Sequence, residues 1–373
     1  SRSLTQVATN ATTHEQHWVF HSSILMQFKT SLPRHLPATD AAPASLHRFK
    51  YDTAGRLVEA NSPEARIEFA YEPAGQRVSE TQTHEDHWSY TLAHTYTPLG
   101  VLQSSAYPDA PPVQWLSYGS GHLHGVEIGG AAVLAFERDA LHREIERQTD
   151  GRICRTIRDA LGRPAQQRMS ARQSPLDTPL WARDNQYDPL GQLRQVKDSV
   201  NGLHTYTYDP SGRLVASRHG QTERNYAFDA AGNRLGAGAS EALPGNRLTE
   251  FEGIDLSYDG AGNLSEKKLP DGTRLHFGYD ALNRMVSLER HNPDGSTLRA
   301  RYAYDVFNRR IRKSVSQGQN TTPRVTRYGW DGERMCAEVM DALTRTTIYE
   351  PGSHVPLLRI DQEEQTPEPV PKL

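Results

Sequence analysis

Two groups of histidines in this chain have spacings that could bind a metal ion. His14, His17 and His21 are three and four residues apart, so on a helix they would share one face. His122 and His124 alternate, as side chains on one face of a strand do. The first group lies in a segment without other periodicity, and the second lies in a repeat. We therefore interpret the first group as part of a solvated, irregular segment and the second as ordinary strand residues.

Other catalytic and cofactor motifs are missing from the sequence. It contains no Gly-x-Ser-x-Gly, Walker loop or Cys-x-x-Cys motif, and its Ser, His and Asp residues follow no spacing that assigns a catalytic triad. Cys154 and Cys336 form no disulfide framework, which indicates synthesis in a reducing compartment. The net charge of −3 gives no basis for nucleic-acid binding, and no apolar run approaches the ~18 residues of a membrane span. We therefore expect no enzyme activity, cofactor, nucleic-acid partner or membrane segment.

A short turn sequence recurs along the chain, and its spacing would fix where the side chains on either side of it lie. In residues 208–214 (YDPSGRL), Asp209 can accept a backbone N–H two residues on, and Pro210 presets φ. Gly212 can adopt the left-handed φ that returns the chain to a strand through a bulge. Tyr206 and Tyr208, before the turn, alternate with threonines as in a strand. Asn-Gly and Asp-Gly pairs between the copies predict turns at the opposite end of each hairpin.

Copies of this turn continue from residue 51 to residue 334 with substitutions. In two copies Asn replaces Gly, and Asn is the residue that best tolerates positive φ after Gly, which supports the turn interpretation. The predicted structural turn residues are Asp52, Gly55, Gly75, Gly100, Asp188, Gly191, Asp209, Gly212, Asp229, Gly232, Asp259, Gly262, Asp280, Asn283, Asp305 and Asn308.

Aromatic and arginine residues recur at fixed places beside the turns. An aromatic residue often stands two positions before the turn motif, which predicts a stripe on one sheet face that packs across strands or, alternatively, stacks a ligand. An arginine follows many turns, as at Arg56, Arg163 and Arg213, and we interpret these arginines as a solvated rim. The stripe consists of Phe49, Phe69, Tyr206, Tyr226, Phe277, Tyr302 and Tyr328.

The composition and the repeats together predict an all-β antiparallel hairpin meander. The hydrophobic fraction of 36% and the mean hydropathy of −0.71 fit a thin sheet with wetted faces, while 16 tyrosines argue against disorder. Open twisted sheets of more than about 10 strands tend to curl, so we expect a curved wall. We divide the chain into a non-repeat segment and linker (residues 1–48), a repeat region (49–362) and a flexible tail (363–373).

The repeated motif resembles the YD repeats of Rhs proteins, which are bacterial polymorphic toxins related to Tc toxin C subunits and to teneurins. Other stretches also resemble Rhs repeat sequences, namely residues 118–125 (YGSGHLHG), 136–139 (FERD) and 349–353 (YEPGS). The resemblance covers about residues 49–362. It implies a β-shell that spirals around a hollow and encloses a C-terminal toxin, with this chain as a wall segment. The spike-loading region, the self-cleaving core and the toxin are expected outside this chain.

The same resemblance implies partners and a route. The partners are the remainder of the shell and core, the toxin domain, and secretion spike and chaperone proteins. The route is type VI secretion in interbacterial competition, from the bacterial cytoplasm into a target cell. Asp188-Pro189-Leu190-Gly191 resembles the family's self-cleavage motif Asp-Pro-x-Gly-Leu, but Gln192 intervenes, so we interpret it as a plain turn. The alternatives are a carbohydrate-binding repeat surface, a Tc C-subunit-like cocoon and a hydrolase with scattered catalytic residues.

Overall fold

Every regular element of the computed structural model is a β-strand, in the residues that it describes. These are residues 14–20, 45–149, 151–173, 179–235, 247–318 and 322–363, with only the backbone described at 14–20, 45 and 46. No helix in these ranges is long and apolar enough to cross a bilayer. The chain divides into two compact units: unit 1 comprises Ser1–Thr95, Ser105–Ala110 and Ile254–Leu373, and unit 2 comprises Tyr96–Ser104 and Pro111–Gly253.

Unit 1 contains two runs of strands that are far apart in the sequence, and each described pair of neighbours is antiparallel. Its first run comprises β1 (His14–Phe20), β2 (Ser45–Tyr51), β3 (Leu57–Asn61), β4 (Ala65–Tyr71), β5 (Arg77–His84) and β6 (Ser89–Tyr96). Its second run comprises β22 (Ile254–Tyr258), β23 (Leu264–Lys268), β24 (Arg274–Tyr279), β25 (Met285–His291), β26 (Thr297–Tyr304), β27 (Arg310–Gln317), β28 (Arg324–Asp331), β29 (Arg334–Met340), β30 (Leu343–Tyr349) and β31 (Pro356–Glu363).

Unit 2 is a meander in which each strand from β8 to β18 pairs antiparallel with the next. Strand β7 (Leu102–Ala106) crosses the boundary between the units. The strands are β8 (Val113–Tyr118), β9 (His122–Ile128), β10 (Ala131–Arg138), β11 (Glu144–Thr149), β12 (Arg152–Arg158), β13 (Pro164–Ala171), β14 (Trp181–Tyr187), β15 (Leu193–Asp198), β16 (Gly202–Tyr208), β17 (Leu214–His219), β18 (Thr222–Asn225), β19 (Ala227–Phe228), β20 (Arg234–Leu235) and β21 (Glu250–Phe251).

The hairpins share one turn geometry, which the motif residues explain. At the β16–β17 turn, Gly212 N donates to Asp209 O (2.9 Å) and Asp209 N donates to Arg213 O (2.9 Å). The strand register shifts between Thr207 and Tyr208, so the motif tyrosine stands at a bulge. Gly212 has a φ of 83°, as the residue that closes this turn requires. The same register shift recurs at Tyr51, Tyr71, Tyr187, Tyr258, Tyr279, Tyr304 and Tyr349.

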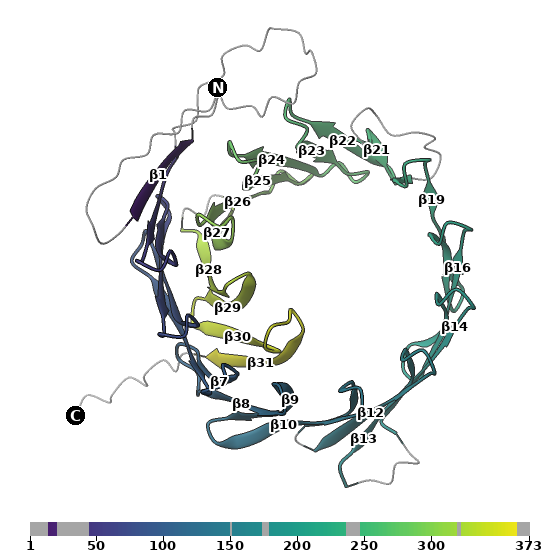
Figure 1. The fold of residues 1–373 in the computed structure, drawn as a ribbon. Helices are drawn as coiled ribbons and strands as arrows, with labels where there is room; N and C mark the ends of the chain where they lie inside the picture. The colour runs from purple at the N-terminus through teal and green to yellow at the C-terminus, as the bar shows by residue number, and fades with distance from the viewer. Residues whose placement is uncertain are drawn as a thin grey trace, which may run out of the picture. The chain divides into compact units, whose positions relative to one another are not determined.

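The apolar core of unit 1 lies where its two runs pack together. In Figure 1 the green-to-yellow strands β27–β30 lie beside the purple-to-blue run that begins at β1. Ala60 and Ile67 of the first run and Ile311 of the second are at most 1% exposed and belong to one cluster. The rings of Phe69 and Phe307 also meet across the runs, with centroids 6.0 Å apart. The all-β antiparallel meander predicted from the sequence is confirmed, while the curling into a spiral and the boundaries at residues 49 and 362 stay predictions.

Candidate functional site

A carboxylate–arginine clamp closes the repeated turn. Asp209 Oδ1 accepts the backbone N–H groups of Ser211 and Arg213, each at 2.9 Å, and Oδ2 accepts Arg213 Nε at 2.7 Å. These donors, led by the N–H of Arg213, hold the pKa of Asp209 below its usual value although burial raises it. The same Asp–Arg pairing occurs at Asp52–Arg56, Asp139–Arg143, Asp159–Arg163, Asp280–Arg284 and Asp305–Arg309.

Each clamp also contacts the next repeat. Arg213 Nη1 donates to Asp229 O in the following turn (3.2 Å), and its guanidinium lies 5.2 Å from the centroid of the Phe228 ring. In the reverse direction, Tyr208 donates its hydroxyl to Leu193 O of the preceding repeat (2.9 Å). Matching tyrosine-to-carbonyl hydrogen bonds are made by Tyr71, Tyr187, Tyr279, Tyr304 and Tyr349.

The arginines predicted to form a solvated rim are only partly solvated, because they are held against the sheet. The side chains of Arg56, Arg163 and Arg213 are only 33%, 28% and 37% exposed, because each one pairs with its turn aspartate and lies against an aromatic ring of the next repeat. This stacking covers one face of several rings in the aromatic stripe or beside it. A sugar could not stack on those covered faces.

The predicted turn residues occupy equivalent places in their turns. Asp188 sits in an ordinary member of the set, since its Oδ1 accepts Gln192 N at 2.9 Å and its carbonyl accepts Gly191 N at 3.0 Å. Asp229 and Asp259 pair with an asparagine in place of the arginine. A left-handed φ is found at Gly55, Gly75, Gly100, Gly191, Gly212, Gly232, Gly262, Asn283 and Asn308.

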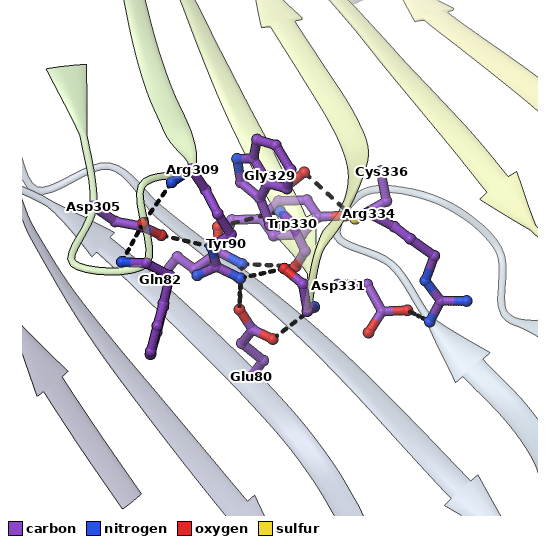
Figure 2. A network of polar contacts seen from close by, with 12 residues as sticks. Glu80, Gln82, Tyr90, Asp305, Arg309, Gly329, Trp330, Asp331, Arg334 and Cys336 are labelled. Atoms are coloured by element: carbon purple, nitrogen blue, oxygen red, sulfur yellow. Dashed lines mark hydrogen bonds and ion pairs between the residues drawn. The ribbon is translucent and has the colours of Figure 1, made fainter. Parts of the chain in front are cut away.

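In unit 1 a second arrangement, the polar seam, joins the two runs of strands (Figure 2). It is a buried network of three arginines and three carboxylates together with polar side chains from β5 and β6. Its carboxylates and Arg309 are at most 7% exposed, whereas Arg77 and Arg334 are 25% and 20% exposed, so the buried charges depend on their partners for stabilisation. The charged members are Arg77, Glu80, Asp305, Arg309, Asp331 and Arg334.

The first half of the polar seam centres on Arg309. Its Nη1 donates to Glu80 Oε1 (2.6 Å) and to Gly332 O (2.7 Å), while its Nε donates to Asp305 Oδ2 (2.6 Å). The side chains of Glu80 and Asp305 are 1% and 0% exposed, respectively. Burial alone would lower the pKa of Arg309, but the two carboxylates raise it above its usual value.

The second half of the polar seam centres on Asp331, at the end of β28. Arg77 pairs with both Asp331 and Glu80, and Arg334 pairs with the other oxygen of Asp331. His94 adds a contact from Nε2 to Asp331 Oδ1 at 3.4 Å. Burial raises the pKa of Asp331, but these cationic neighbours and His94 bring it below its usual value, so the carboxylate stays ionised.

Backbone contacts complete the polar seam. Gln82 Nε2 donates to Trp330 O (2.7 Å) and Trp330 N donates to Gln82 Oε1 (3.2 Å), so this side chain pairs with a strand as a neighbouring backbone would. The ring of Tyr90 lies directly over Gly329, where an added Cβ would be 2.8 Å from three ring atoms. Tyr90 OH lies 3.3 Å from Cys336 Sγ, and burial raises the pKa of this thiol to about 12, which removes it as a nucleophile.

The geometry of the polar seam is that of a fastener, since its hydrogen bonds join side chains of the two runs to one another and to the backbone, and only Nη2 of Arg309 among the described polar atoms of the six charged side chains is buried without a partner. Sequence reasoning placed Asp305 in a turn but missed that Glu80, Gln82, Arg77 and Asp331 join it in one network through Arg309 and Trp330. The one local indication was two polar residues, Glu80 and Gln82, at alternating positions of β5, where apolar residues would be expected on a face that packs against another layer.

The histidine groups are placed as follows. His14 and His17 lie in strand β1, which pairs with β2, so neither the helical arrangement nor the irregular segment predicted there is correct. His21 lies outside the described residues. His122 and His124 lie in strand β9 as predicted, and His122 stacks on His142 with ring centroids 3.7 Å apart. Within the described ranges, no three His, Cys, Asp or Glu side chains are grouped so that they could hold a metal.

Comparison with known proteins identifies relatives of this repeat. The family profile described as teneurin YD-shell matches residues 134–323. The toxin protein Tse5 of Pseudomonas aeruginosa is 40% identical over 369 residues, covering 88% of this chain and 28% of the relative. The double-stranded DNA deaminase toxin A of Burkholderia cenocepacia is 32% identical over 346 residues, covering 86% of this chain and 24% of the relative. The chain thus spans less than a third of either relative.

The fold has a counterpart among solved structures. A crystal structure of TcdB2-TccC3 matches 87% of this chain and 22% of that chain, with a TM-score of 0.55 and 14% identity. At this identity the match shows a common fold and nothing finer. The resemblance to YD-repeat proteins that the sequence predicted is confirmed.

Proposed function

Because this chain belongs to the teneurin YD-shell family, we propose that it is a wall segment of a shell that encloses a C-terminal toxin domain of the complete protein. The chain itself performs no catalysis in this proposal. Its repeat region extends over residues 49–362, between a linker and a tail. The wall curls around a hollow, and the remainder of the shell and its core close it. The predicted turn residues, from Asp52 to Asn308, act as the structural joints of the wall.

The observation that carries this proposal is the clamp between consecutive turns. In several turns an aspartate binds the turn's own arginine, and that arginine also binds a carbonyl of the next turn, as Arg56, Arg213, Arg284 and Arg309 do. A contact that repeats from hairpin to hairpin extends a sheet without requiring a thick apolar core. A thin wall of this kind suits a container whose interior must stay available for cargo.

The complete protein is proposed to act as a polymorphic toxin that is delivered into a target cell. Two relatives that match most of this chain carry the word toxin in their names. We place the protein in the bacterial cytoplasm before export and propose type VI secretion, with spike and chaperone proteins as partners. No cofactor is required by this role.

Protease protection of the complete protein tests the enclosure. The C-terminal domain should resist a protease that readily digests the isolated domain. A variant with the polar seam broken, Glu80→Lys with Arg309→Met, should make the domain sensitive, because the wall loses its fastening. The matched control is Arg213→Met, which removes the equivalent arginine from a clamp that is partly exposed and does not join the two runs. A C-terminal domain that is digested as readily in the intact protein as in isolation would exclude enclosure by this wall.

A further inference from the structure

The turn between β5 and β6 makes a second set of contacts in unit 1, beyond the end of the polar seam. Arg312 of β27 and Arg327 of β28 lie directly opposite each other in register, an arrangement that is repulsive by itself. Glu85 pairs with Arg312, and Asp86 Oδ2 accepts hydrogen bonds from Arg327 Nη2 (2.6 Å) and Nε (3.0 Å). The two carboxylates of this turn, which belongs to the first run, therefore neutralise an arginine pair on the second run.

A histidine is buried at the base of the same turn. The His84 residue is 3% exposed, and neither ring nitrogen has a hydrogen-bond partner in the described structure. Its ring packs against Trp88 with centroids 4.6 Å apart. The charged groups that act on it are Asp86 from its own turn, Arg312 from β27 and Arg327 from β28. A neutral imidazole is tolerated in this place, whereas a proton would create a third cation with no acceptor.

We propose that the β5–β6 turn is an acid-sensitive latch, in which uptake of a proton by His84 releases the turn from β27 and β28. At neutral pH, the polar seam and the latch would both hold the two runs of unit 1 together. On acidification, the cationic imidazole would repel Arg312 and Arg327 and would gain hydration only by leaving its buried site. The latch goes beyond the proposed structural role of the wall, because it makes the packing of the two runs of unit 1 depend on pH.

The pH range of the latch follows from the two states of His84. Burial, helped by Arg312 and Arg327 and opposed by Asp86, lowers the pKa of His84 from 6.5 to about 4 in the closed state. Since the opened turn returns the imidazole to its ordinary pKa, the closed state is fully favoured above pH 6.5 and loses stability as the pH falls from 6.5 toward 4. By linkage, the opening equilibrium should rise about 30-fold between pH 7.5 and pH 5.

Asp86, a carboxylate of the latch itself, does not account for a response in the same pH range. Burial raises the pKa of Asp86, but hydrogen bonds from Arg327 and from the N–H of Trp88 bring it below its ordinary value. Asp86 therefore remains ionised while His84 takes up its proton, and the ion pair on Arg327 persists until the pH is lower still.

Amide hydrogen exchange of this chain at pH 7.5 and pH 5, corrected for intrinsic rates, measures the opening directly. Peptides from the β5–β6 turn and from β28 should exchange through an opening about 30-fold more populated at pH 5. Peptides from the β14–β15 hairpin of unit 2 serve as an internal reference. The variant His84→Phe should remove the acid response, since a phenyl ring can pack on Trp88 without titrating. The matched control His87→Asn, at an exposed position of the same turn with a φ of 63°, should retain it.

A second measurement does not depend on any variant. Exchange of the imidazole C2 hydrogen, followed by mass spectrometry across pH, titrates His84 in the unmodified chain. A midpoint well below 6.5 supports the latch. A midpoint near 6.5, or an equal acid response in His84→Phe and the unmodified chain, overturns the proposal.

Discussion

Replacing Arg309 by methionine should strongly destabilise the packing of the two runs in unit 1. The methionine keeps much of the apolar stem but removes the charge that Glu80 and Asp305 share. Glu80 would keep Arg77 and the N–H of Gly332, and Asp305 would keep two backbone N–H groups of its own turn. Neither carboxylate would be left without donors, but both would be buried beside one cation fewer.

The expected loss follows from the burial of this group. Breaking a buried ion pair by removing one partner costs about 3–5 kcal/mol, because an uncompensated charge remains. With the arginine side chain 7% exposed and its partners 1% and 0% exposed, Arg309 falls in this class. The loss should lie toward the lower end, about 3 kcal/mol, since the remaining donors still solvate both carboxylates.

Arg213→Met provides a matched control for this prediction. Arg213 has the same place in the motif, a similar bond to its aspartate (2.7 Å) and a similar distance to the aromatic ring of the next repeat (5.2 Å, against 5.8 Å for Arg309 and Trp330). Its side chain is 37% exposed, so water screens the pair and the loss should be far smaller. Urea unfolding with native-state amide exchange over β5 and β28 measures both variants. Equal losses for the two variants would refute the assignment of the polar seam as a buried fastener.

The charge balance of the polar seam can be tested with a third variant. Glu80→Gln added to Arg309→Met leaves two arginines and two carboxylates in the network. The double variant should therefore be less destabilised than the sum of the single variants, with a coupling of about 0.5–3 kcal/mol. Additive losses would show that Glu80 and Arg309 do not act on each other.

Four further outcomes are expected. Gly329→Ala should cost about 1–3 kcal/mol in urea unfolding, because its Cβ would overlap the buried ring of Tyr90, and a normal stability would mean that the ring moves freely. Gly212→Val should cost at least ~1 kcal/mol at a φ of 83°, with faster amide exchange confined to β16 and β17; melting of all repeats together would contradict the repeat array. Tyr208→Phe should cost about 1 kcal/mol by removing the hydrogen bond to Leu193 O, measured against Tyr206→Phe. Intact-mass measurement after incubation should give one species, whereas a fragment pair split near Gly191 would show that the Asp188 turn cleaves itself.

The repeated turns could be predicted from the sequence because their causes are local. Asp209, Pro210 and Gly212 each favour one turn geometry, and the contacts that they make span at most four residues. The replacement of Gly by Asn at residue 283 pointed to the same conformation, and Asn283 has a φ of 60°. A pattern whose physical cause lies within a few residues is visible in one sequence.

The polar seam could not be predicted because its partners lie on distant strands. Arg309 and Glu80 are 229 positions apart, and Gln82 and Trp330 are 248 apart. Nothing in the motif around Arg309 indicates that it would differ from Arg213, for which the described residues offer no such partner on a distant strand. The exposure of the motif arginines was overestimated for a related reason. An exposed turn suggests an exposed arginine, but the guanidinium lies over the aromatic ring of the next repeat.

Arg309 connects the repeat to the polar seam. It makes the motif contact with its own aspartate, and its Nη1 reaches the carbonyl of Gly332 in the next turn, as motif arginines do elsewhere. It differs by one further hydrogen bond, to Glu80 on the opposing layer. At Arg309, one acidic residue on β5 adds a link between distant runs to the link between neighbouring repeats. Because the arginine was already oriented by its turn, the added ion pair orders few new groups and loses little conformational entropy. A wall of repeats can thus gain a fastener at one turn without any change in the turn itself.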